Sequence, residues 1–279
     1  MILFAKLLCG EVSIEVEEPS LGRRLVTLFL LERHSSGLPP VLHIVIGGEN
    51  SFIVTEEGRL VSSGLRFCDL VLVLDQIFER VIRDAKIPGA VSLHASSALM
   101  SGKAISFVGR SGSGKTTFAL EASKFGDGLL GDEYAWFDVD RCCLAHELSP
   151  VHVKDGGLFQ LGSMESSAVR IIGCDGFRVN FVNSRSLGLA EGSEWQPLHA
   201  FVFPRFDAGC RKTELRPMDA LSFAEKFIES AVLDTNASRM LKRLWRLIGS
   251  GKVLAISITY SSVEDACVSL LSELGLPAT

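Results

Sequence analysis

One short segment of the chain has the residue types and spacing of a phosphate-binding loop. It fits the pattern G-x-x-x-x-G-K-[ST], in which glycines let the backbone curl so that successive N–H groups point at phosphate oxygens. The lysine of this pattern reaches the β- and γ-phosphates, and the final hydroxyl ligates Mg²⁺. ATP and Mg²⁺ are therefore the expected ligands. The residues are Gly109, Arg110, Ser111, Gly112, Ser113, Gly114, Lys115 and Thr116.

The residues on either side of this loop favour a functional match. An apolar, strand-like run at 104–108 precedes the loop, and a helix-forming run at 118–122 follows it. This is the order that the mechanism requires, and a chance match of residue types would not account for it. A dinucleotide-binding fingerprint fails because Thr117 stands where a third glycine is needed. We assign the phosphate contacts to residues 109–117.

The surroundings of the loop narrow the class of nucleotide-binding protein. The sequence contains neither the Asn-Lys-x-Asp base reader of GTPases nor the Leu-Ser-Gly-Gly signature of ABC-type ATPases. Instead, the acidic pair Asp132-Glu133 follows Lys115 after about one helix and a turn, and Leu-His-Ala-Ser precedes the loop at 93–96. This arrangement resembles the catalytic domain of the HPr serine kinase/phosphorylase family. It resembles still more the HPr-kinase-related proteins encoded beside peptide-modification genes, such as those of lasso peptides.

The resemblance covers roughly residues 90–274. It includes Phe-Val-Phe-Pro-Arg-Phe at 201–206 and Ile-Thr-Tyr at 258–260. Two departures limit what it implies, because the family's Asp-Asp pair is Asp-Glu here and the later glycine-rich signature has no match. Phosphorylase activity and HPr itself as the substrate are therefore not carried over.

The resemblance implies an α/β P-loop kinase domain of the HPr kinase / PEP carboxykinase-like type. It implies transfer of a γ-phosphate to a Ser or Thr hydroxyl of a peptide or small protein. Asp132 would take the proton of that hydroxyl, with Lys115 and His94 near the phosphates. Thr116 and Glu133 would hold Mg²⁺, the latter through water. The alternatives are a turn aspartate, a solvated glutamate and a core histidine.

Other basic residues have weaker assignments. Arg110 lies inside the loop and can reach a phosphate, and Arg205 is a candidate for charge stabilisation or a surface ion pair. A basic stripe at i, i+3, i+4 and i+7 is usually a solvated helix face, but it can also dock an acidic peptide. The stripe consists of Arg239, Lys242, Arg243 and Arg246.

Two other functions stay open at this point. One is a small-molecule kinase that acts on free serine or a similar metabolite. The other is a nucleotide-binding regulator with little turnover, which Asp132 facing away from Thr116 would favour. The resembled enzyme is a hexamer, so a homo-oligomer is also an expectation.

Hydrophobic periodicity predicts the elements that position these residues. Alternation at 11–17 and apolar runs at 25–31, 41–46 and 52–55 predict strands, and a helix over 70–82 stops at Pro88-Gly89. We therefore expect a small β-rich domain with a helix at 1–88 and the catalytic domain at 89–279. Within the latter, strands are predicted at 91–100, 103–108, 198–203 and 253–258, and helices at 219–233 and 263–274.

The composition and charge of the chain argue against several classes of protein and partner. The formal net charge of -5 argues against a nucleic-acid partner. The 7 cysteines form no CxxC pair, which fits a reducing cytoplasm rather than a disulfide framework. Residues 1–9 are expected to form a strand rather than a signal peptide, because no basic n-region precedes them. Charges interrupt every long apolar stretch, so we expect no membrane partner.

Overall fold

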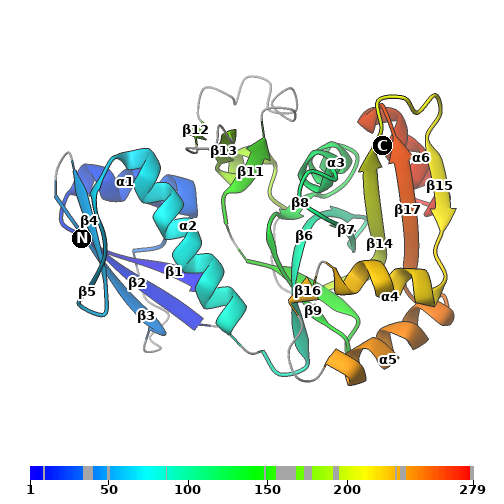
Figure 1. The fold of residues 1–279 in the computed structure, drawn as a ribbon, viewed down its shortest axis with the longest axis horizontal. Coiled ribbons are helices and arrows are strands. Elements are labelled where there is room, and N and C mark those ends of the chain that lie inside the picture. The colour runs from blue at the N-terminus through cyan, green and yellow to red at the C-terminus, as the bar shows by residue number, and fades with distance from the viewer. Residues whose placement is uncertain are drawn as a thin grey trace. The chain divides into compact units, whose positions relative to one another are not determined.

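The protein is a mixed α/β structure, seen here in a computed structural model (Figure 1). The structure describes residues 1–8, 10–33, 40–48, 51–85, 87–147, 149–154, 168–172, 178–190, 195–229, 231–232 and 237–276. Contacts divide the chain into two units. Unit 1 holds the described residues of 1–87, 148–156 and 163–183, and unit 2 holds the others. The single predicted boundary at residue 88 did not anticipate the later segments of unit 1.

Unit 1 is built on a five-stranded sheet in the order β1-β2-β3-β4-β5. Strands β2 and β3 are parallel and the other neighbours are antiparallel. The strands are β1 (Ile2–Leu7), β2 (Gly10–Val16), β3 (Leu42–Gly47), β4 (Phe52–Glu56) and β5 (Arg59–Leu65). Helices α1 (Pro19–Phe29) and α2 (Phe67–Asp84) contribute to one hydrophobic core with this sheet.

A second, three-stranded sheet of unit 1 has the order β11-β13-β12. Its strands are β11 (Val151–Lys154), β12 (Val169–Ile172) and β13 (Arg178–Val182). Phe181 and Ile171 join the same hydrophobic core as α2, and His152 lies 3.2 Å from Asp75 of that helix. A polar contact and apolar packing thus join this sheet to α2.

The predicted strand at 25–31 is wrong, because α1 occupies residues through Phe29. Pro19 stands at the helix start, where its missing N–H costs nothing. Leu21, Leu25, Leu28 and Phe29 are buried at helical spacing. The run of apolar residues that looked like a strand is the buried stripe of a helix.

Unit 2 contains a larger sheet whose main path is β10-β9-β6-β7-β14-β17-β15, with β8 and β16 also paired to β6. Strands β7, β14 and β17 are parallel to one another. The strands are β6 (Ala90–Met100), β7 (Lys103–Val108), β8 (Gly128–Gly131), β9 (Tyr134–Asp138), β10 (Cys143–His146), β14 (Gln196–Phe206), β15 (Glu214–Pro217), β16 (Ala231–Val232) and β17 (Leu254–Tyr260).

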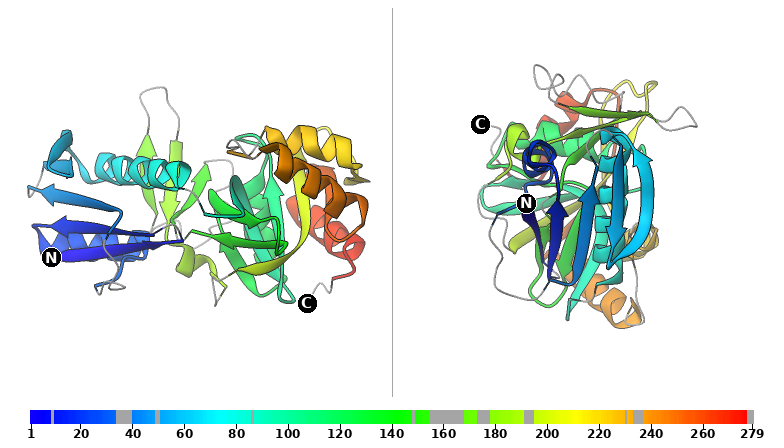
Figure 2. Two further views of the ribbon diagram at one scale, coloured as in Figure 1. Left: turned by 90° about the horizontal axis from the view of Figure 1, so that it is seen from below. Right: turned by 90° about the vertical axis from the view of Figure 1, so that its left-hand side faces the viewer.

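The helices of unit 2 cover this sheet in two groups. Helices α3 (Lys115–Ser123) and α6 (Val263–Glu273) contact each other. Helices α4 (Ala220–Ile228) and α5 (Ala237–Gly249) also contact each other and are the yellow and orange helices of Figure 2. The second pair helps to bury a cluster of aromatic rings that includes Phe201 of β14 and Phe223 and Phe227 of α4. A 3₁₀ helix lies at Ser184–Leu187.

The predicted strands and helices of unit 2 are largely confirmed. The strands expected at 91–100, 103–108, 198–203 and 253–258 correspond to β6, β7, β14 and β17, and the last helix to α6. The helix expected at 219–233 is too long, because α4 ends at Ile228 and β16 pairs with β6 instead. None of the helices among the described residues has the length and apolarity to cross a lipid bilayer.

Candidate functional site

The glycine-rich loop connects the end of β7 to the start of α3. Strand β7 is buried between β6 and β14, so the loop begins at a fixed edge of the sheet. Gly109, Gly112 and Gly114 have φ angles of 152°, 82° and 100°, in the region that side chains rarely adopt. The glycines therefore permit the backbone course that brings the loop into α3.

Gly114 is further constrained by Tyr260 of β17. A Cβ at Gly114 would lie 2.1 Å from the Tyr260 hydroxyl oxygen, whereas a Cβ at Gly112 would have nothing within 4 Å. Burial raises the pKa of Tyr260 to about 12, so this hydroxyl stays protonated at neutral pH. The close approach of a parallel strand to the loop is thus a second reason for glycine at 114.

Gly114→Ala is expected to destabilise the protein by about 1–3 kcal/mol more than Gly112→Ala, because only the former adds a clash to the backbone strain. Urea unfolding of both variants measures the difference. Tyr260→Phe in the Gly114→Ala background removes the clashing oxygen and should recover most of that difference. Equal stability of the two alanine variants would contradict the constraint.

Lys115 is buried in the first turn of α3, with 6% of its surface exposed. Its Nζ donates a hydrogen bond to the Arg110 carbonyl oxygen at 3.4 Å, which places the charge toward the first half of the loop. A buried ammonium at the positive end of a helix dipole is unfavourable for folding. The same charge and dipole together favour an anion, so this arrangement is suited to binding phosphate.

Asp132 lies in contact with the loop, as the kinase interpretation requires. It directly follows β8, is 1% exposed, and accepts hydrogen bonds from Thr116 Oγ1 at 3.0 Å (Oδ1) and 3.3 Å (Oδ2). The hydroxyl of Ser96 on β6 also donates to Asp132. These hydroxyl donors offset part of the cost of burying a carboxylate. Three elements thus converge on one acidic group beside the candidate Mg²⁺ ligand.

Glu133 and His94 form a second pair next to this carboxylate. His94 Nδ1 lies 3.0 Å from Glu133 Oε2. Glu133 has a φ angle of 66°, which is uncommon for a residue other than glycine and is often found at functional sites. The two predicted site residues are therefore brought together, and their pairing orients the Glu133 carboxylate.

Sequence reasoning missed Ser96 and a second buried polar contact of β6, between Ser97 and His146. His146 of β10 contacts Ser97 Oγ through Nε2 at 2.8 Å and packs so closely against Gly131 that a Cβ there would lie 2.5 Å from its ring. Burial lowers the pKa of His146 to about 3, so this ring is neutral at neutral pH. The sequence signal for both contacts was the pair of adjacent serines, Ser96 and Ser97, in a largely apolar strand.

The remaining basic residues have different surroundings. Arg110 forms a two-point ion pair with Glu229, with N–O distances of 3.0 and 3.2 Å. In the basic stripe, Lys242, Arg243 and Arg246 are exposed, and Arg243 pairs with Asp140. The side chain of Arg239 lies outside the described residues. The stripe therefore has the character of a solvated face.

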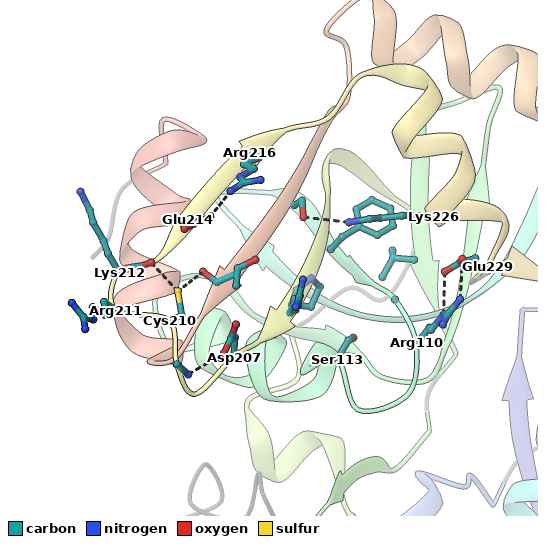
Figure 3. Close-up of a pocket in the computed structure, with 18 residues that line it drawn as sticks. Arg110, Ser113, Asp207, Cys210, Arg211, Lys212, Glu214, Arg216, Lys226 and Glu229 are labelled. Atoms are coloured by element: carbon teal, nitrogen blue, oxygen red, sulfur yellow. Dashed lines mark hydrogen bonds and ion pairs between the residues drawn. The ribbon is translucent and has the colours of Figure 1, made fainter.

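A pocket of about 820 Å³ borders the loop within unit 2 (Figure 3). Gly109, Arg110 and Ser113 form its wall on the loop side. The opposite walls come from the end of β14, the turn that follows it, β15, β17 and α4. Arg205 lines this pocket, so the sequence-predicted cation lies on the same cavity as the loop.

No protein-family model and no curated protein matches this chain. The resemblance to HPr-kinase-like proteins therefore remains a prediction that rests on the motif residues.

Proposed function

We propose that the chain is a kinase that transfers the γ-phosphate of ATP to a Ser or Thr hydroxyl of a peptide or small protein, in the cytoplasm. Unit 2 would then be a P-loop kinase domain of the HPr kinase / PEP carboxykinase-like type. The observation that carries the proposal is the buried Asp132 carboxylate in hydrogen-bond contact with Thr116, at the end of a loop that also buries Lys115.

The residues present fit a nucleotide with Mg²⁺. Mg²⁺ prefers oxygen ligands and takes few of them from protein side chains. The Thr116 hydroxyl and the carboxylate of Asp132 or Glu133 would hold it, directly or through water. When bound, Mg²⁺ neutralises negative charge on the β- and γ-phosphates.

The protein's own groups would bind the phosphates and deprotonate the acceptor hydroxyl. The N–H groups of residues 109–117 and the Lys115 ammonium bind the phosphates. Asp132 accepts the proton of the acceptor hydroxyl. The hydroxyl oxygen bonds to the γ-phosphorus, and the bond between the γ-phosphorus and the oxygen that leaves with ADP breaks. His94 fixes Glu133 beside this centre.

A second role for Asp132 is supported by the same contact. A carboxylate that accepts from the Mg²⁺-binding hydroxyl can orient that hydroxyl rather than take the acceptor's proton. The two roles make different predictions for the Mg²⁺ requirement of an Asp132→Asn variant.

Incubation with ATP and Mg²⁺ tests the proposed transfer. We expect a Ser/Thr-containing peptide library to gain phosphate, seen as a mass increase of about 80 Da per site. EDTA should abolish the gain. Phosphorylation of free serine in a parallel reaction, with all peptides unchanged, would instead assign a small-molecule kinase. Tight ATP binding with neither product would assign a nucleotide-binding regulator and refute the kinase.

A further inference from the structure

The pocket beside the glycine-rich loop has a large excess of positive charge. Among its 18 lining residues, six are basic and three are acidic, a formal excess of +3 in a chain whose net charge is -5. The basic residues are Arg110, Arg205, Arg211, Lys212, Arg216 and Lys226. A concave site with one dominant sign of charge concentrates ligands of the opposite sign.

The acidic residues of the pocket are already engaged. Glu229 pairs with Arg110, Glu214 with Arg216 at 2.7 Å, and Asp207 accepts from the Gly209 N–H at 2.9 Å. Pairing within the pocket therefore compensates only part of its positive charge.

Three cations remain uncompensated. The side chains of Arg205, Arg211 and Lys212 have no hydrogen-bond or ion-pair partner among the residues that the structure describes. All three are exposed. Arg205 lies near the end of β14, and Arg211 and Lys212 lie in the turn that follows it (Figure 3). They form a cationic rim, defined by these three residues, to which an anion can bind without displacing an existing partner.

The lining is poorly suited to a nucleoside base. Sites for such rings are mostly apolar and aromatic. Here only Val108, Phe203 and Pro204 contribute hydrocarbon side chains, and Lys226 Nζ lies 5.6 Å from the centre of the Phe203 ring. The chemistry of the pocket favours a polar, negatively charged ligand.

The position of the pocket relates it to the acceptor. Lys115, whose charge reaches the β- and γ-phosphates in such loops, points its Nζ at the carbonyl of Arg110, and Arg110 lines the pocket. The acceptor hydroxyl must approach from beyond the γ-phosphate. The pocket shares Gly109, Arg110 and Ser113 with the loop, so a ligand in it would lie beside the phosphates bound there.

We propose that this pocket binds the acceptor through an acidic group, a carboxylate or phosphate, close to the acceptor hydroxyl, with the cationic rim as its partner. The proposal rests on the proposed kinase function and adds the chemical class of the acceptor. The planar guanidinium groups of Arg205 and Arg211 suit two-point contact with carboxylate or phosphate oxygens.

Equilibrium binding of labelled peptides tests this site without requiring turnover. One peptide carries a serine flanked by glutamates, a second replaces them with glutamines, and a third replaces them with phosphoserines. With a non-hydrolysable ATP analogue and Mg²⁺ present, fluorescence anisotropy should show at least about tenfold tighter binding of an acidic peptide than of its glutamine twin. The third peptide distinguishes phosphate from carboxylate recognition.

Charge-removing variants locate the effect. Arg211→Gln with Lys212→Gln should abolish the preference for acidic peptides and leave the affinity for the ATP analogue unchanged. Arg205→Gln alone should reduce the preference for acidic peptides. Lys103→Gln with Arg141→Gln removes the same charge from exposed positions outside the pocket and should change neither affinity. Circular dichroism checks that each variant is folded.

The outcomes separate the two proposals. Equal affinity for the acidic and glutamine peptides, or weaker binding of the ATP analogue in the rim variants with peptide preference intact, would overturn the acceptor site. A rim-dependent preference for acidic peptides without any phosphoryl transfer would sustain the site and refute the kinase. Phosphoryl transfer to peptides with no preference for acidic ones would sustain the kinase and refute the acceptor site.

Discussion

Asp132→Asn is expected to reduce phosphoryl transfer about a hundredfold or more while nucleotide affinity changes little. The substitution keeps the size of the side chain but removes the negative charge that faces Thr116 and Ser96. An amide also brings N–H donors toward hydroxyls that now donate to the carboxylate, so one contact is lost or reversed. Single-turnover kinetics with radiolabelled ATP, together with calorimetric ATP binding, measure the two quantities separately.

Two neighbouring substitutions calibrate this result. Ser96→Ala removes one hydroxyl donor and leaves the Asp132 charge in place, so its effect on the transfer rate should be much smaller. Glu133→Gln neutralises the adjacent acid and breaks the charge attraction to His94. If Glu133→Gln lowers the rate at saturating Mg²⁺ more than Asp132→Asn does, then the proton acceptor is Glu133.

A magnesium titration distinguishes the two roles proposed for Asp132. A proton acceptor leaves the Mg²⁺ concentration for half-maximal rate unchanged when it is neutralised. A group that orients the Thr116 hydroxyl raises that concentration, and excess Mg²⁺ then restores much of the rate. Full turnover by a folded Asp132→Asn variant at ordinary Mg²⁺ would eliminate both roles.

The local parts of this arrangement could be predicted from the sequence because they depend on neighbours along the chain. The strand at 103–108, the glycine-rich loop and the helix that begins at Lys115 follow one another without interruption. Glycine tolerates positive φ wherever it stands, so the loop pattern carries its own conformation. Apolar alternation and helical spacing similarly predicted β6, β7 and α6.

The errors arose where partners distant in sequence decided the structure. The apolar run at 25–31 matched a strand, but Leu25, Leu28 and Phe29 form the buried stripe of a helix that shares a core with the sheet of unit 1. The end of α4 depends on the pairing of Ala231 and Val232 with β6, more than 130 residues earlier. The helix or strand propensity of a segment's own residues carries no information about a pairing partner so far away in the sequence.

The polar contacts of the site were only partly predictable for the same reason. The resemblance to HPr-kinase-like proteins predicted that Asp132 lies near the loop, but Ser96 reaches Asp132 across 36 positions, and Glu229 reaches Arg110 across 119. The cationic rim was visible as single basic residues, among which only Arg205 was singled out. Its significance depends on which of these cations lack an acidic partner, a property of the folded chain.

Lys115→Ala is the second substitution with a large expected effect. Loss of a charge-assisted contact to the phosphates should cost about 1.5–3 kcal/mol of binding, which weakens ATP affinity by at least about tenfold. The fold should survive, because the buried ammonium opposes the helix dipole rather than stabilising α3. Calorimetry measures the affinity, and urea unfolding without nucleotide measures the stability.

Two further lysine variants decide whether charge or packing is responsible. Lys115→Met keeps the unbranched stem that is buried with the loop, so it should bind ATP as weakly as Lys115→Ala if the ammonium contributes the affinity. Lys103→Met removes an exposed lysine at the opposite end of β7 and should leave affinity unchanged. Unchanged ATP affinity in a folded Lys115→Met variant would mean that the phosphates are not bound at this loop, and the proposed kinase function would lose its basis.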